Sequence, residues 1–292
     1  MGEIRIDLHT HSSASDGTDA PELMAQLARD AGLAALGLAD HDTVAGWEAA
    51  SVGAKAAGVT LVRGIEMTAH MLVDPAEHPD AERRVSVHML GYLFDPSEPQ
   101  MAAHMAAMCT AREDRAREIV DRLAVDFPIS WELVQEYREP GAPVGRPHIA
   151  DALVALGVGE NRSAIFAKVL ASTSQYYVPN KSALATDAVQ WIRAAGGKAV
   201  LAHPKANARG NYLPDSAIRD LAEAGLFGLE VEHRDNTLSE RPALAALAKE
   251  LRLARFGASD YHGTGKPNRM GENLTSPEVL DLLAAGAFLP LI

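Results

Sequence analysis

Residues 4–42 read IRIDLHTHSSASDGTDAPELMAQLARDAGLAALGLADHD and contain two apolar runs with a longer mixed segment between them. The short runs at 4–8 and 33–39 predict strands, because each is bounded by polar or small residues. The segment 20–32 has the apolar spacing of an amphipathic helix. A strand, a helix and a second strand in this order predict a βαβ unit, in which the two strands run parallel.

The same alternation continues through most of the chain. The further predicted strands are 59–67, 85–94, 198–202, 226–231 and 253–258. Helical spacing separates the later ones, at 184–195, 214–224 and 239–251. Seven strands, expected to run parallel with helices outside them, predict an α/β fold, a (β/α)7 barrel. We expect this barrel to comprise residues 1–96 and 182–292.

Residues 97–181 interrupt the alternation. This segment begins with a charged helical run, AAMCTAREDRAREIVDRLA, and contains no convincing strand before YYVPNK at its end. We interpret it as a helical insertion between the fourth and fifth strands. Because sites in such barrels form at the ends of the strands, the insertion is expected to be a lid that sets substrate specificity.

Charge and composition exclude several classes of function. The chain has 292 residues, a formal net charge of −12 at pH 7 and one cysteine, Cys109. The negative charge disfavours binding of long duplex nucleic acid, which usually needs a basic surface. The first residues lack a signal-peptide pattern, and no apolar run approaches the ~18 residues of a membrane span. With no possible internal disulfide, we expect a cytoplasmic protein that does not bind membranes.

Metal-binding residue types gather at the predicted strand ends. Six of the eleven histidines lie at or just after such an end, and carboxylates accompany them. His9 and His11 alternate on a strand, so both side chains point to the same face and one cation could bind both. The motifs at the strand ends are HTH (9–11), ADHD (39–42), GIE (64–66), VHML (87–90), AHP (202–204) and SDYH (259–262). Repetition at so many ends predicts a single metal site.

On these motifs the sequence resembles the polymerase and histidinol phosphatase domain family, within the wider amidohydrolase-like metal enzymes. The family carries nine metal ligands, and all nine positions can be filled here. They are His9, His11, Asp16, His41, Glu66, His88, His203, Asp260 and His262. The barrel is expected to be distorted, as in this family. The insertion, including GRPHIADALV (145–154), further resembles the subgroup of nucleoside 3',5'-bisphosphate phosphatases and 5'-to-3' exoribonucleases.

The resemblance implies a trinuclear metal site. The first ion would be held by His9, His11, Glu66 and Asp260, the second by Glu66, His88 and His203, and the third by Asp16, His41 and His262. Mixed imidazole and carboxylate ligands suit Mn, Fe or Zn better than Ca or Mg, and we expect three Mn²⁺ ions. The ligands expected to act most directly in catalysis are Asp16, His41, Glu66 and His262.

Such ions can lower the pKa of a bound water from ~16 to ~7, so no Ser or Cys nucleophile is required. Asp7 and Asp40 precede ligand segments and could orient metal-bound histidines, although loop capping is the alternative for Asp40. Three further cations, Arg146, Lys181 and Lys205, are placed to bind a substrate phosphate.

The leading hypothesis is a phosphatase that removes the 3'-phosphate of nucleoside 3',5'-bisphosphates and gives the nucleoside 5'-monophosphate. Short oligoribonucleotides, cleaved from the 5' end, are a second expected substrate. A histidinol-phosphate phosphatase would share the ligand set, and a non-catalytic metal-binding module is the alternative outside enzymes. Activity on phosphomonoesters separates these alternatives.

Overall fold

The computed structural model describes residues 4–74, 84–139, 141–206 and 211–292. Its strands are β1 Ile6–Thr10, β2 Ala35–His41, β3 Thr60–Leu72, β4 Arg84–Tyr92, β5 Ala183–Leu184, β6 Lys198–Leu201, β7 Lys205–Ala206, β8 Asn211–Tyr212, β9 Gly228–Glu232 and β10 Ala254–Gly257. Its α-helices are α1 Pro21–Asp30, α2 Trp47–Ala57, α3 Pro99–Leu123, α4 Trp131–Gln135, α5 Arg146–Ala155, α6 Arg162–Lys168, α7 Ala185–Ala194, α8 Asp215–Ala224, α9 Arg241–Glu250 and α10 Pro277–Ala284. All seven strands predicted from apolar runs are present, with shifted ends.

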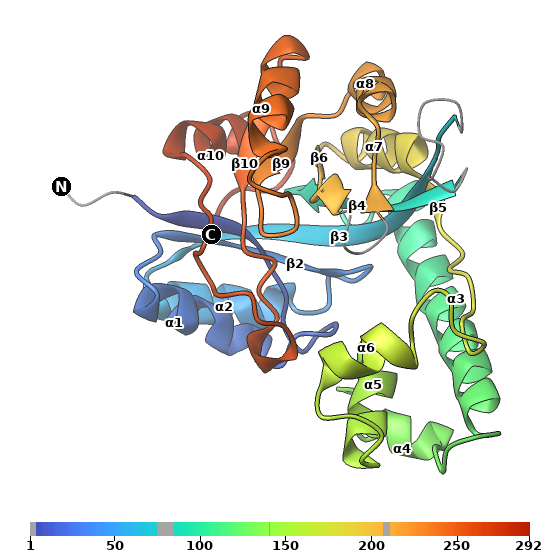
Figure 1. The fold of residues 1–292 in the computed structure, drawn as a ribbon. Helices are drawn as coiled ribbons and strands as arrows, with labels where there is room; N and C mark the ends of the chain where they lie inside the picture. The colour runs from blue at the N-terminus through green and yellow to red at the C-terminus, as the bar shows by residue number, and fades with distance from the viewer. Residues whose placement is uncertain (1–3, 75–83, 140, 207–210) are drawn as a thin grey trace.

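The main sheet has the order β1-β2-β3-β4-β6-β9-β10, with the short β5 paired to β3. A bridge between Thr10 and Tyr261 links the two ends of this order, so the sheet almost closes into a barrel. Helices α1 and α2 lie on one side of the sheet and α7 to α9 on the other, as Figure 1 shows. The predicted α/β barrel class is therefore confirmed.

One expectation about the sheet is wrong: its strands are not all parallel. Strand β4 runs antiparallel to both of its neighbours, β3 and β6. Strands β3 and β4 pair over nine residues each as a long two-stranded ribbon, from Gly64–Tyr92 to Leu72–Arg84. Strands β1, β2 and β3 pair in parallel, and so do β6, β9 and β10. Because β4 is antiparallel to both β3 and β6, these six strands all run in the same direction.

Alternation along β1 explains why the site forms on this sheet. Ile6 and Leu8 pack into an apolar cluster with Val62, Tyr92 and α10. His9 and His11 have the opposite parity and so point to the other face of the strand. A second, larger cluster joins the sheet to α1, α2, α7, α8 and α9. The apolar packing of Ile6 and Leu8 on one face thus fixes the strand that presents the two histidines on the other.

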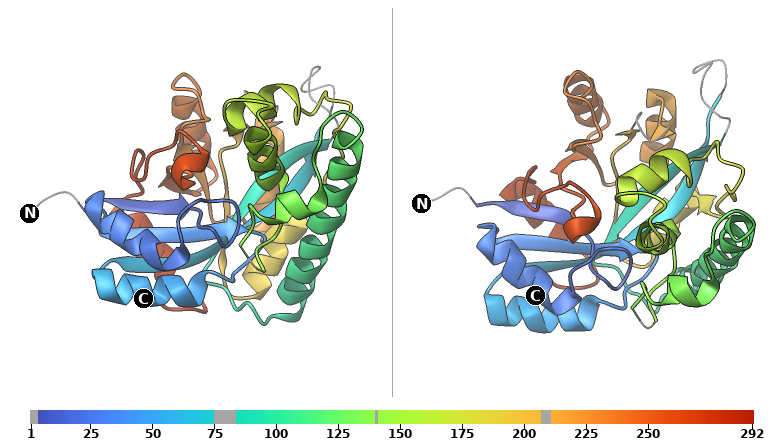
Figure 2. Two further views of the ribbon diagram at one scale, coloured as in Figure 1. Left: turned by 90° about the horizontal axis from the view of Figure 1, so that it is seen from below. Right: turned by 60° about the horizontal axis from the view of Figure 1, so that its bottom comes forward.

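Helices α3 to α6 lie between β4 and β5 in the chain, within the predicted insertion. They have an apolar core of their own, which includes Ile119, Leu123, Ile149 and Leu153. Figure 1 shows α4, α5 and α6 grouped beside the far end of α3, and both views of Figure 2 keep this grouping. Because β4 is antiparallel, it ends at Tyr92, which pairs with Gly64 in the first half of β3, and the 25-residue α3 begins after this end of β4. Within the described residues, no helix is long and apolar enough to cross a membrane.

Candidate metal centre

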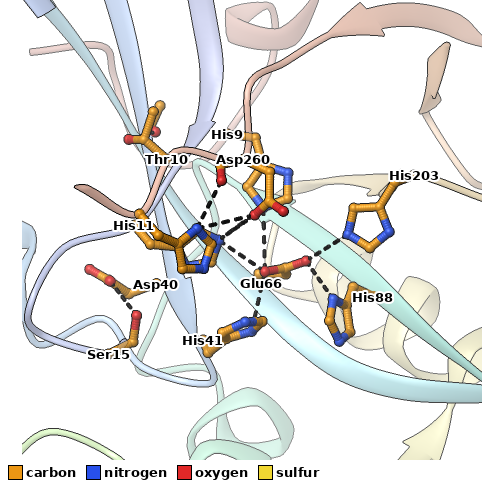
Figure 3. A network of polar contacts seen from close by, with 12 residues as sticks. His9, Thr10, His11, Ser15, Asp40, His41, Glu66, His88, His203 and Asp260 are labelled. Carbon is orange, nitrogen blue, oxygen red and sulfur yellow. Dashed lines mark hydrogen bonds and ion pairs between the residues drawn. The ribbon is translucent and has the colours of Figure 1, made fainter. Parts of the chain in front are cut away.

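Glu66 is the hub of the site. Its Oε2 atom lies 3.3 Å from His9 Nε2, 3.0 Å from His11 Nε2 and 3.2 Å from His41 Nδ1. Its Oε1 atom lies 2.7 Å from His88 Nδ1 and 3.4 Å from His203 Nε2. One carboxylate, 1% exposed, therefore faces five imidazoles from four different segments, as Figure 3 shows.

The two oxygens of Glu66 face two different groups. On the Oε2 side, Asp260 Oδ1 lies 3.6 Å from His9 Nε2 and 3.4 Å from His11 Nε2. These four side chains offer ligand atoms that are all within 4.8 Å of one another. Near the Oε1 atom of Glu66 lie the rings of His88 and His203. The geometry matches a carboxylate shared between two cations.

A third group lies beside the first. Asp16 Oδ1 is 3.2 Å from His262 Nε2, and Asp16 Oδ2 is 3.8 Å from His41 Nε2. The ligand atoms of Asp16, His41 and His262, together with His11, also lie within 4.8 Å of one another. All nine residues predicted as ligands therefore lie in one region. The structure groups Glu66 and His88 with His41, whereas the family resemblance places His203 with them.

Two observations show that these residues are suited to bind divalent cations. Several buried ring nitrogens and carboxylate oxygens make no hydrogen bond in the described part of the chain, although such atoms are normally paired. They are His11 Nδ1, Asp16 Oδ1, His41 Nδ1, both oxygens of Glu66, His88 Nδ1, His203 Nε2 and His262 Nε2. Unpaired polar atoms that converge on shared points are typical of residues that bind a metal ion.

Charge balance is the second observation. Burial would raise the pKa of Glu66, but the facing imidazoles hold that pKa well below its usual range. Burial likewise lowers the pKa of His11, yet Asp260 and Glu66 raise it to about 9. The buried carboxylates are therefore stabilised only if positive charge lies beside Glu66. Divalent cations supply that charge and leave the imidazoles neutral, as ligands must be.

The positions of the ligands in the fold differ partly from expectation. Glu66 and His88 are not at strand ends but inside the β3–β4 ribbon, because these two strands extend beyond the barrel as a pair. His203 and Asp260 follow β6 and β10, as predicted, and both have left-handed backbones, with φ of 27° and 55°. Such backbones are uncommon for residues other than glycine and concentrate at functional sites.

Asp7 and Asp40 make no hydrogen bond or ion pair with the imidazole of a predicted ligand. Asp7 accepts hydrogen bonds from the backbone N–H groups of Ser259, 3.1 Å, and Gly271, 2.7 Å, and so ties β1 to the segment that carries Asp260. Asp40 accepts from Ser12 N–H and from the hydroxyl groups of Ser12 and Ser15. Both acids therefore stabilise the loops of the site and do not orient the imidazole rings. For Asp40, the loop-capping alternative is the better description.

The three predicted phosphate-binding cations lie in different surroundings. Lys205 is buried, and its ammonium donates to Leu213 O and to the Asp215 carboxylate, 2.8 Å. The Lys205 ammonium is thus already paired with groups of the protein, which leaves it poorly placed to bind a substrate phosphate. Lys181 is exposed and makes no ion pair with a described residue. Arg146 is partly buried, donates to Leu170 O at 3.1 Å and lies over the ring of Phe166.

Sequence reasoning missed one contact that joins the insertion to the site. Asp42, directly after the ligand His41, accepts from Arg112 of α3, with Nε at 2.7 Å. Both residues also bond Thr68, which pairs with His88 across the β3–β4 ribbon. The acid in ADHD was visible in the sequence, but its partner lies 70 residues away in the chain.

Glu230 was missed as well. Glu230 lies between the apolar residues Leu229 and Val231 of the strand GLEVE, and an acid in this position is the signal that could have found it. In the structure it is fully buried beside His9, 2.8 Å from its Nδ1.

Comparison with known proteins gives a consistent picture. A family model described as PHP domain matches residues 7–196. The chain is 32% identical to a 5'-3' exoribonuclease of Haemophilus influenzae, over 92% of this chain and 94% of that one. It is 31% identical to a 3',5'-nucleoside bisphosphate phosphatase of Chromobacterium violaceum, over 90% and 89%. It is 33% identical to a phosphoribosyl 1,2-cyclic phosphate 1,2-diphosphodiesterase of Eggerthella lenta, over 88% and 94%.

A solved structure is also similar along the whole chain. It is a proposed metal-dependent phosphoesterase from Bifidobacterium adolescentis, 39% identical, with a TM-score of 0.89 over 98% of this chain and 97% of that one.

Proposed function

The chain belongs to the PHP domain family and is a metal-dependent phosphatase, and from this premise we propose that its substrates are nucleoside 3',5'-bisphosphates. The reaction removes the 3'-phosphate and leaves the nucleoside 5'-monophosphate. Short oligoribonucleotides, cleaved from the 5' end, are the second substrate class of the proposal, in line with the name of the exoribonuclease relative.

We propose three ions, held as the three groups described above, with Mn²⁺ preferred and Fe or Zn compatible with the same ligands. When bound, the ions lower the pKa of water at the site and offset charge on the phosphoryl oxygens. The nine side chains then supply the geometry. Glu66 links two groups through its two oxygens, while Asp16, His41 and His262 present the third group to the substrate.

Exposure indicates the side from which a substrate reaches the site. The His88 side chain is 20% exposed, and those of Asp16 and His41 are 11% exposed. The remaining ligand side chains are at most 3% exposed. The substrate phosphate therefore approaches past Asp16, His41 and His88. Arg112 of α3 is bonded to residues beside two of these three, so the insertion borders the same side.

A group of arginines in the insertion carries the substrate proposal. Burial, together with the positive charges of Arg146 and Arg112, lowers the pKa of Arg115 to about 10. Burial also lowers the pKa of Arg146, and the positive charge of Arg112 contributes in the same direction. Neither Arg115 nor Arg146 has an ion pair among the described residues; Arg115 donates to Val178 O. Partly buried guanidinium groups without acids are typical of a site for an anion.

A bisphosphate meets both requirements. One phosphate lies at the metal ligands, and the other pairs with Arg146 and its neighbour Arg115. A cavity of about 360 Å³ between the loop residues Ser13, Gly17 and Thr18 and insertion residues that include Arg138, His148 and Arg162 lies beside the site. Neither Arg146 nor Arg115 lines it, so the placement of the second phosphate rests on the two arginines alone. We propose that residues 97–181 act as the lid that selects the substrate.

Replacing Arg146 by alanine should impair the bisphosphate selectively. The loss of a charged partner costs about 2 to 5 kcal/mol, so kcat/KM on adenosine 3',5'-bisphosphate should fall at least about tenfold. A simple aryl phosphate has no second phosphate and should lose much less. Steady-state kinetics of both enzymes on both substrates give the comparison.

Arg117→Ala is the matched control, since Arg117 is an exposed arginine of the same insertion whose partner is Glu113 on its own helix. Equal losses on both substrates in Arg146→Ala would refute a role for Arg146 at the second phosphate. Activity on histidinol phosphate, with none on the bisphosphate, would refute the substrate proposal while leaving the phosphatase assignment intact.

A further inference from the structure

Glu230 holds two of the proposed metal ligands at once. Its Oε1 atom lies 2.8 Å from His9 Nδ1, and its Oε2 atom accepts a hydrogen bond of 2.8 Å from the backbone N–H of His203. His9 belongs to the first metal group and His203 to the second. The side chain of Glu230 is fully buried, and its own backbone oxygen is bonded by Asn236.

Packing alone does not account for an acid at this position. The strand neighbours Leu229 and Val231 are fully buried and apolar, and no described Lys or Arg forms an ion pair with Glu230. Burying a carboxylate in such surroundings costs several kcal/mol unless hydrogen bonds compensate. The two bonds to His9 and His203 are that compensation, so the acid is tied to the metal ligands rather than to the core.

We propose that Glu230 is a positioning residue that aligns His9 and His203 for their metal ions, and this rests on the metal site proposed above. A proton on His9 Nδ1, donated to Glu230, leaves Nε2 as the lone-pair nitrogen. That Nε2 faces the shared centre, 3.0 Å from His11 Nε2 and 3.3 Å from Glu66 Oε2. The second bond fixes the backbone of His203, whose φ of 27° is one that an unsupported residue rarely adopts.

Glu230→Gln is the informative change, because an amide is nearly the same size but has only one acceptor oxygen. A carboxylate accepts at both ends, whereas the amide must place an NH₂ group against either His9 Nδ1–H or the N–H of His203. One of the two bonds is therefore lost. Loss of such a supporting contact typically weakens metal affinity about 10- to 100-fold.

The experiment is a titration of metal-free protein with Mn²⁺, in which free Mn²⁺ is followed by electron paramagnetic resonance. Wild type should bind three equivalents. In Glu230→Gln, two equivalents should bind at least about tenfold more weakly. The equivalent held by Asp16, His41 and His262 should keep its affinity, because Glu230 does not contact these residues. No substrate is involved, so the result does not depend on which phosphoester the enzyme hydrolyses.

Glu232→Gln is the matched control, because Glu232 is on the same strand but pairs with Arg255 at the surface, 2.6 Å. It should bind Mn²⁺ as wild type does. Wild-type affinity in folded Glu230→Gln would overturn the proposal, and so would equal weakening of all three equivalents. A fourth wild-type equivalent lost in the variant would overturn it too, since His9, Glu230 and His233 would then be ligands of an ion themselves.

If Glu230→Gln does not fold, Glu230→Asp provides the test. Aspartate keeps the charge but is one methylene shorter, so it cannot reach both His9 and the backbone of His203. The same two equivalents should weaken, by less than in the amide variant. Unchanged affinity in folded Glu230→Asp would overturn the proposal.

Discussion

Glu66→Gln should abolish most phosphatase activity and remove two of the three ions. The amide keeps the shape of the side chain, but it no longer brings negative charge to five imidazoles. Metal ions supply several kcal/mol of stabilisation to the charged transition state, so turnover should fall at least about 10³-fold. Elemental analysis and turnover of the purified variant, after Mn²⁺ loading, measure both effects.

The third group provides the internal control for this variant. Asp16, His41 and His262 should retain about one ion, because none of their partners is removed except the contact between His41 and Glu66. A variant that keeps three ions and near-normal turnover would show that Glu66 is not a bridging ligand. Circular dichroism confirms that the comparison is made on folded protein.

Asp16→Ala should lower turnover about 10²- to 10³-fold and leave the fold stable, an effect typical of removing one charged group that stabilises a transition state. Burial raises the pKa of Asp16, but His262 and His41 hold it well below its usual range, so the carboxylate is ionised, as the proposed ligand role requires. Asp16 lies in the loop between β1 and α1 and belongs to neither apolar core around the sheet. Its removal therefore affects chemistry more than the free energy of unfolding.

Asp19→Ala in the same loop is the matched control, since Asp19 accepts a hydrogen bond from the Tyr261 hydroxyl and is not among the grouped ligands. It should retain most of its turnover. If Asp16→Ala behaved like Asp19→Ala, Asp16 would be only a turn-capping residue. Thermal unfolding of the three proteins shows whether any loss of turnover reflects stability.

The βα alternation and the set of candidate ligands could be predicted from the sequence, because both are local patterns. His9 and His11 are recognisable as a pair on one strand face, and apolar runs mark every strand that brings a ligand. Strand direction is not local. An apolar alternating run looks the same in a parallel and an antiparallel strand, so the reversal of β4, and with it the position of His88 inside the β3–β4 ribbon, could not be read from the residues.

Contacts between segments that are distant in the chain could not be predicted from the sequence either. Lys205 follows a predicted ligand and appeared free for a phosphate, yet the turn before α8 brings Asp215 to its ammonium. Arg112 is part of the charged helical run at the start of the insertion, and only the fold places it beside Asp42. Helix α10 was likewise not predicted, although its apolar residues close one end of the sheet.

The central claim is that nine residues from separate segments form one centre for three metal ions. The most direct test is the metal-to-protein ratio of wild type, measured by elemental analysis after loading with Mn²⁺ and removal of free ions. The account predicts about three ions per chain. A ratio near zero in protein that is fully folded would contradict it.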